Sequence, residues 1–78
     1  MIYQLDDKKF KFSYTNGNCW ERFKIEMFDG LKLNPIADMS DLGVKVNGSA
    51  YINTDIENKN RVVEVNDKAM KYVKMLLS

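Results

Sequence analysis

Residue types that carry out catalysis or bind metal ions are scarce in this chain. It has no histidine and a single cysteine, Cys19, so it cannot form a Ser–His or Cys–His nucleophile or a zinc site of imidazole and thiolate ligands. Its four glycines are isolated and form no phosphate-binding loop. The carboxylates that could act alone are Glu21, Glu26, Asp38, Asp41 and Glu64. Paired carboxylates need a cleft, which a core this small rarely leaves. We predict that the protein is not an enzyme and uses no metal or cofactor.

Aromatic and basic side chains in the stretch 20–28 offer a different chemistry, the recognition of another protein. If this stretch is a strand, Phe23, Ile25 and Met27 share one face and point inward, and the alternate residues point outward. Exposed aromatic residues beside charged ones are typical of a protein-binding hot spot. The predicted partner-binding residues are Trp20, Arg22, Lys24, Phe28 and, from a neighbouring strand, Tyr51. The alternative is that the aromatic residues of this set pack under residues 31–42 as a second small core.

Lysines alternate with aromatic residues in the sequence KKFKFSY at 8–14, which suggests a second kind of partner. Aromatic side chains on a sheet stack on bases, and nearby lysines contact phosphates. The candidate nucleic-acid-binding residues are Lys8, Lys9, Lys11, Lys68, Lys71 and Lys74. Lys9 and Lys11, however, point away from Phe10, Phe12 and Tyr14, which we expect in the core. Twelve basic and eleven acidic residues give a net charge of +1, so no overall attraction to nucleic acid or to a membrane follows.

The elements that would position these residues are mainly short strands. Period-two alternation predicts strands at 1–5, 8–14 and 20–28, with tight turns at Asp6-Asp7 and Asn16-Gly17. A helix is the competing interpretation of 19–28. A further turn is expected at Asp29-Gly30, and residues 55–60 are expected to form a polar loop. The remaining predicted strands are 31–33, 44–46, 49–54 and 61–65.

Two helices complete the predicted fold. A short one at 34–42 would be capped by Asn34, with Pro35 at its first position and Gly43 after its end. A longer one would start at an Asn66 cap and bury one stripe of apolar residues. That stripe consists of Ala69, Met70, Val73, Leu76 and Leu77. The sequence thus predicts one α+β domain over 1–78, an antiparallel sheet of about five or six strands with a short middle helix and a C-terminal amphipathic helix packed on one face.

The functional hypothesis follows from the exposed aromatic and basic residues that we expect and from the scarcity of catalytic residue types. We recognise no family in the sequence. The first hypothesis is a non-enzymatic protein-interaction module that binds and blocks or modulates a partner, such as a phage- or mobile-element-encoded inhibitor of host machinery. The alternative is a small single-stranded nucleic-acid-binding domain. A homodimer through an exposed sheet edge, at 44–46 or 61–65, is a third arrangement. The lone cysteine and the lack of a signal peptide or a long apolar run predict a cytoplasmic protein that binds no membrane.

Overall fold

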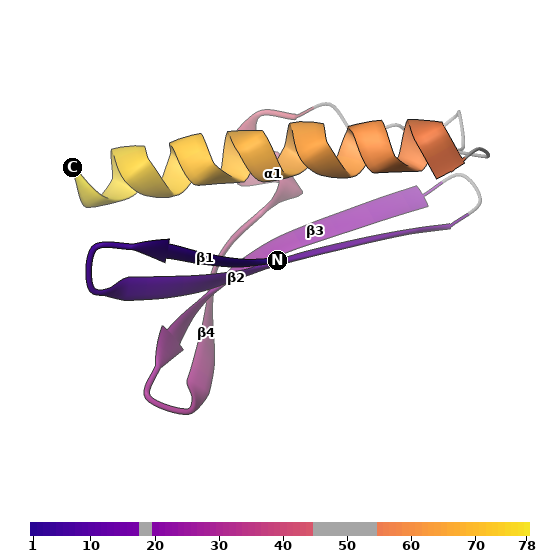
Figure 1. Cartoon of the computed structure of the whole chain (residues 1–78). Helices are drawn as coiled ribbons and strands as arrows, with labels where there is room; N and C mark the ends of the chain where they lie inside the picture. Colours follow the sequence, from indigo (N-terminus) through magenta and orange to yellow (C-terminus); the bar gives the residue numbers. More distant parts are fainter. Residues whose placement is uncertain (18–19, 45–54) are drawn as a thin grey trace.

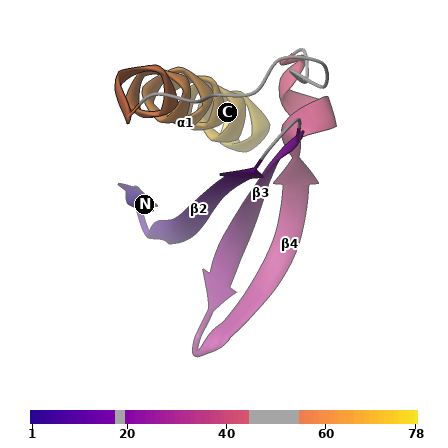
Figure 2. The same ribbon diagram turned by 90° about the vertical axis from the view of Figure 1, so that its right-hand side faces the viewer.

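The computed structural model describes residues 1–17, 20–44 and 55–78. In these residues the fold is α+β: one antiparallel sheet with the strand order β1-β2-β3-β4, and a long C-terminal helix, α1, that lies across one face of it (Figure 1). Figure 2 shows the sheet and the helix as two layers, with the β3–β4 hairpin extending away from the helix. The predicted class is confirmed, but the described sheet has four strands rather than five or six.

The first three strands follow the period-two alternation of the sequence. β1 is Ile2–Leu5, β2 is Lys8–Gly17 and β3 is Trp20–Asp29. The helix proposed as the alternative for 19–28 is therefore excluded. The turn at Asp6-Asp7 is confirmed, and Asp6 adopts a positive φ of 54° there. The turn predicted at Asn16-Gly17 is wrong, because both residues belong to the ladder, where Gly17 pairs with Trp20. The connection falls at 18–19, outside the described residues.

The fourth strand replaces most of the predicted middle helix. β4 is Lys32–Asp38, so the strand expected at 31–33 continues through Pro35. Proline is tolerated because β4 is an edge strand, where a missing N–H breaks no ladder on the outer side. The register with β3 shifts at Ile25/Glu26, which indicates a bulge next to this proline. The helical part shrinks to a single 3₁₀ turn, η1 (Met39–Leu42), capped by Asp38 instead of Asn34.

The end of η1 agrees with the sequence. Gly43 follows it with φ 68° and ψ 20°, the left-handed conformation expected after a helix end, and its N–H donates to the carbonyl oxygen of Ser40. Val44 is buried in the core and lies outside the strands. The rest of the strand predicted at 44–46 and all of the one at 49–54 lie outside the described residues.

The C-terminal helix is about twice as long as predicted. α1 spans Asp55–Leu77, so the loop predicted at 55–60 and the strand predicted at 61–65 are both wrong, and Asn66 lies inside the helix instead of capping it. Val65, Ala69 and Val73 are fully buried. Their spacing of four places them on one helix face, and the burial gained there outweighs the few tenths of a kcal/mol by which valine disfavours a helix.

The core lies between α1 and the inner face of the sheet, the face turned toward the helix. Its buried residues are Phe10, Phe12, Phe23, Ile25, Met39, Val44, Val65, Ala69 and Val73. Phe12 contacts Tyr3 and Phe23 through tilted and edge-on ring pairs. The predicted apolar stripe of the helix is thus correct for Ala69 and Val73 but wrong at its end, since Leu76 and Leu77 are exposed. The stripe starts one turn earlier than predicted, at Val65.

Candidate functional site

The outer face of the sheet, the face turned away from α1, carries the described residues of the predicted partner-binding set. Burial alternates along β3: Glu21, Phe23 and Ile25 are buried, and the residues between them are exposed. The alternate positions place Trp20, Arg22, Lys24 and Phe28 on the outer face. Tyr51 lies outside the described residues. The single strand β3 therefore brings these four residues together, and α1 lies on the opposite side of the sheet (Figure 2).

Trp20 is the most exposed aromatic side chain of this face, at 47%. Its indole ring lies against Gly17, its partner in the β2–β3 ladder, so closely that a Cβ at this position would overlap the ring. The guanidinium carbon of Arg22 lies 5.5 Å from the indole centroid on the same strand, within the range of a cation–π contact. The ring is therefore held in place between a glycine and an arginine while it remains accessible to a partner.

Phe28 lies at the other end of this face and is partly buried. The ammonium group of Lys9 lies 5.6 Å from its ring centroid. Between the two aromatic residues, Lys24 contacts Glu26 with an N–O distance of 3.6 Å. The Lys24 side chain is 60% exposed, so this ion pair adds little stability and leaves the lysine available.

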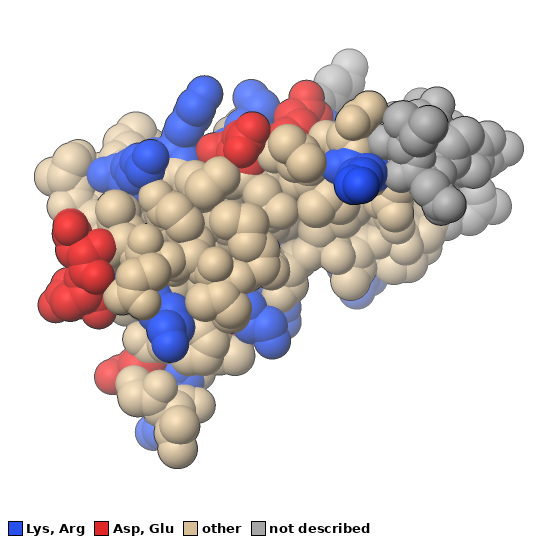
Figure 3. Space-filling view, in the orientation of Figure 1, with Lys and Arg blue, Asp and Glu red and all other residues tan. Residues whose placement is uncertain are grey.

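The six lysines proposed for nucleic-acid binding do not form one surface. Lys9 and Lys11 lie on the outer face, where Lys11 pairs with Glu26 of β3, whereas Lys8 is in phase with the buried Phe10. The other three, Lys68, Lys71 and Lys74, are exposed residues of α1, which covers the opposite face of the sheet. In the view of Figure 3, basic atoms lie in several separate places instead of one continuous area.

A buried polar cluster that the sequence analysis missed connects α1 to β3. The Glu21 side chain is only 2% exposed, and its two carboxylate oxygens accept hydrogen bonds from Arg61, at 3.0 Å from Nε and 2.8 Å from Nη2. The hydroxyl of Tyr14 donates to Glu21 Oε1 at 2.7 Å. Arg61 also donates to Glu64, one turn further along the helix. A nearby amide pair, Asn16 to Asn58 at 3.2 Å, joins the same two layers.

The contacts within this cluster raise the pKa values of Tyr14 and Arg61. Burial, together with the hydrogen bond to Glu21 and the charge of that carboxylate, raises the pKa of Tyr14 to about 12. The hydrogen bonds from Arg61 to Glu21 raise the pKa of the arginine still further above its usual range. The sequence contains one indication of this cluster. Glu21 shares the period-two phase of Phe23 and Ile25, so its carboxylate is expected to be buried, and a buried carboxylate requires a cationic partner.

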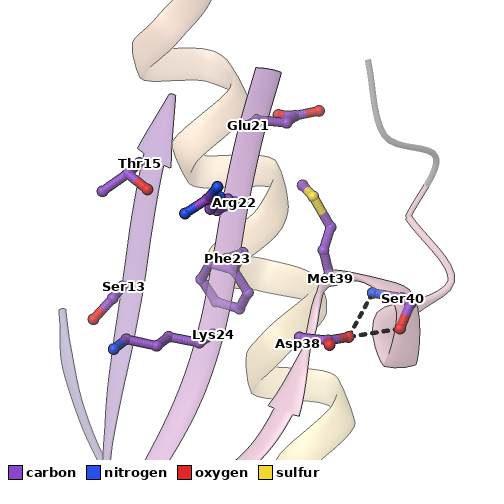
Figure 4. Close-up of a pocket in the computed structure, with 9 residues that line it drawn as sticks. All are labelled: Ser13, Thr15, Glu21, Arg22, Phe23, Lys24, Asp38, Met39 and Ser40. Atoms are coloured by element: carbon purple, nitrogen blue, oxygen red, sulfur yellow. Dashed lines mark hydrogen bonds between the residues drawn. The ribbon is translucent and has the colours of Figure 1, made fainter. Parts of the chain in front are cut away.

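A hollow of about 590 Å³ opens beside the N-terminal half of β3 (Figure 4). It lies there because β4 pairs with β3 only as far as Lys24 and Asp38, after which the chain turns into η1. Phe23 and Met39 form its apolar part, and Glu21 lies at one end. Its other polar lining residues are Ser13, Thr15, Arg22, Lys24, Asp38 and Ser40.

Neither a metal site nor a membrane-spanning helix is found in the described part of the chain. Within 1–17, 20–44 and 55–78, no three His, Cys, Asp or Glu side chains are grouped closely enough to hold a metal ion. Over the same ranges, no helix has the length and apolar character needed to cross a membrane. Comparison of the chain with protein-family models, with curated proteins and with solved structures finds no match. The arrangement of the side chains is therefore the basis for any functional inference.

Proposed function

We propose that this protein is a non-enzymatic interaction module that binds a partner protein through the outer face of its sheet. The observation that carries this proposal is the exposed indole of Trp20, held between Gly17 and Arg22. Tryptophan and arginine are the residues most enriched in hot spots, where a few side chains supply most of the binding energy. Because the ring is already fixed in the free protein, binding loses little side-chain entropy.

The composition of the rest of the face supports the same proposal. Phe28 with Lys9 and Lys24 with Glu26 surround the Trp20–Arg22 pair with mixed apolar and charged groups, which is the usual composition of a rim around a hot spot. The mode of action we propose is to occupy the partner's surface and block or modulate it, as phage- or mobile-element-encoded inhibitors of host machinery do. This last step is an analogy from size and the missing catalytic residue types. A cytoplasmic location is a further part of the proposal.

A small single-stranded nucleic-acid-binding domain is the second candidate. One observation favours it: Lys9 and Lys11 share the outer face with Trp20 and Phe28, as a site that combines stacking and phosphate contacts requires. Two observations weigh against it. Lys9 and Arg22 each lie over one of the two aromatic rings, where a base would otherwise stack. The carboxylates of Glu26 and Asp38 also lie on this face and repel phosphates.

The test is capture of partners from a lysate of the source cell, with and without nuclease, with wild type, Trp20→Ala and Val63→Ala as bait. Val63 is an exposed apolar residue of α1, so its variant controls for the general loss of apolar surface. We expect a protein that is retained after nuclease treatment, lost with Trp20→Ala and kept with Val63→Ala. Recovery that disappears with nuclease and falls steeply with salt would instead support the nucleic-acid-binding candidate. Equal recovery with all three baits would disprove the proposed face.

A further inference from the structure

The hollow beside β3 lies at the edge of the proposed partner-binding face and shares two residues with it. Ladder pairs place Thr15 opposite Arg22 and Ser13 opposite Lys24, and Lys24 is in turn opposite Asp38 on β4. Directly opposite residues of a ladder lie on the same face, about 5 Å apart at Cβ. The outer-face lining of the hollow therefore consists of two adjacent cross-strand rows of hydroxyl and charged groups, with η1 as its wall (Figure 4).

The two carboxylates that line the hollow are both engaged within the protein. Glu21 accepts two hydrogen bonds from Arg61 and one from Tyr14. Asp38 Oδ1 accepts hydrogen bonds from the Ser40 amide at 3.0 Å and from the Ser40 hydroxyl at 2.6 Å. Both carboxylates therefore already accept hydrogen bonds from donors within the protein, and Asp38 forms no ion pair with Arg22 or Lys24 within 4.0 Å in the described residues.

The two cations of the lining are less engaged. In the described part of the chain, the guanidinium of Arg22 has no carboxylate within 4.0 Å; its contact is the apolar face of Trp20. Lys24 reaches only the exposed pair with Glu26. Because Lys24 is paired with Glu26, Arg22 is the cation of the lining that has no carboxylate partner among the described residues, and it is the group that an incoming carboxylate can pair with. A stacked guanidinium with its N–H groups free is the group that binds a planar carboxylate through two hydrogen bonds.

We propose that this hollow receives an acidic side chain of the partner protein, with Arg22 as its principal ligand and Lys24 and the hydroxyls of Ser13 and Thr15 as supporting donors. The exposed indole of Trp20 beside Arg22, together with the apolar lining residues Phe23 and Met39, favours an acidic residue flanked by apolar ones over an isolated anion. This inference rests on the proposed function, because it names the chemistry of the partner that the same face binds. The exposed indole of Trp20 would then pack beside the acidic residue.

The test is a titration followed by NMR of ¹⁵N-labelled protein, with the capped pentapeptide SLELS and its uncharged counterpart SLQLS as probes. We expect the glutamate peptide to bind about tenfold more tightly than the glutamine peptide, because a charge-assisted, two-point hydrogen bond is lost in the latter. Its signal shifts should centre on the Arg22 side-chain N–H and the amides of Thr15 and Ser40. Arg22→Gln should abolish the difference between the peptides, and Arg22→Lys should keep part of it.

Matched controls separate this site from general charge attraction. Lys59→Gln removes an exposed lysine of α1 and should leave the ratio of the two affinities within about twofold, given the screening of distant exposed charges. Inorganic phosphate and a short oligothymidylate serve as further probes. Equal affinity for the two peptides, loss of the difference with Lys59→Gln, or tighter binding of the oligothymidylate than of the glutamate peptide would each overturn the proposal.

The two proposals fail in different experiments. Capture of a nuclease-resistant, Trp20-dependent partner combined with no preference for the glutamate peptide would leave the interaction module intact and disprove the acidic anchor. An Arg22-dependent preference for the glutamate peptide without any captured protein would support the anion site and disprove the wider function.

Discussion

Replacing Arg61 by methionine should destabilise the fold strongly, although Arg61 is a partly exposed residue of α1. Methionine keeps the length and apolar part of the side chain but removes the guanidinium that donates two hydrogen bonds to the Glu21 carboxylate, whose side chain is 2% exposed. Breaking a buried ion pair by removing one partner costs about 3–5 kcal/mol, because the other charge stays buried. The remaining hydrogen bond from Tyr14 compensates in part, so we expect a loss of about 3 kcal/mol at neutral pH.

That loss is large for a chain of this size. Single domains are stable by about 0.05–0.15 kcal/mol per residue, which gives this chain a total of roughly 4–12 kcal/mol. A domain of 60–100 residues loses about 4–8 °C in melting temperature per kcal/mol. The Arg61→Met variant should therefore melt roughly 12–24 °C below wild type.

The assay is urea denaturation at neutral pH, followed by circular dichroism, with wild type and variant measured side by side. Glu64→Gln is the matched control: Glu64 also accepts a hydrogen bond from Arg61 but is 53% exposed, so its loss should cost about 0.5 kcal/mol or less.

A double variant tests the reasoning further. Glu21→Leu combined with Arg61→Met replaces the buried pair by apolar side chains and should recover most of the loss, to within about 1 kcal/mol of wild type. A loss below about 1 kcal/mol for Arg61→Met alone, or a double variant no more stable than the single one, would refute the account of a buried charge that requires its partner.

Three further predictions concern the sheet and the helix. Because the pKa of Tyr14 is raised to about 12, above the ordinary tyrosine value of about 10, the stability that it contributes is complete below pH 10 and is lost as the pH rises through 12. Tyr14→Phe should flatten this part of a pH–stability curve. Gly17→Ala should displace the indole of Trp20, and a red shift of its fluorescence, with little change in circular dichroism, would show it. Val65→Ala should cost about 2 kcal/mol in urea denaturation, and Val63→Ala, at an exposed helix position, should cost no more than about 0.5 kcal/mol; equal losses would contradict the helical register.

The sequence predicted correctly wherever a local pattern agreed with the tertiary environment. The alternation of Phe10 and Phe12 with lysines predicts β2 and its buried face, and the same alternation predicts the two faces of β3. The prediction from sequence was wrong at two segments, where the local pattern is typical of a different secondary structure from the one that forms. Pro35 resembled the first residue of a helix, yet it lies in an edge strand that continues to Asp38. Val62 and Val63 resembled part of a strand, yet they belong to α1, because the buried residues Val65, Ala69 and Val73 follow one another at helical spacing.

By itself, then, the sequence determined the α+β class, the first three strands and the outward placement of Trp20 and Arg22, because each depends on side-chain spacing within one segment. Only the tertiary structure decided where α1 begins and how the candidate site is built. Glu21 and Arg61 are 40 residues apart, and the hollow beside β3 exists because β4 ends at Asp38 while β3 continues. Contacts of this kind depend on how elements pack across the chain, and no periodicity within a single segment records them.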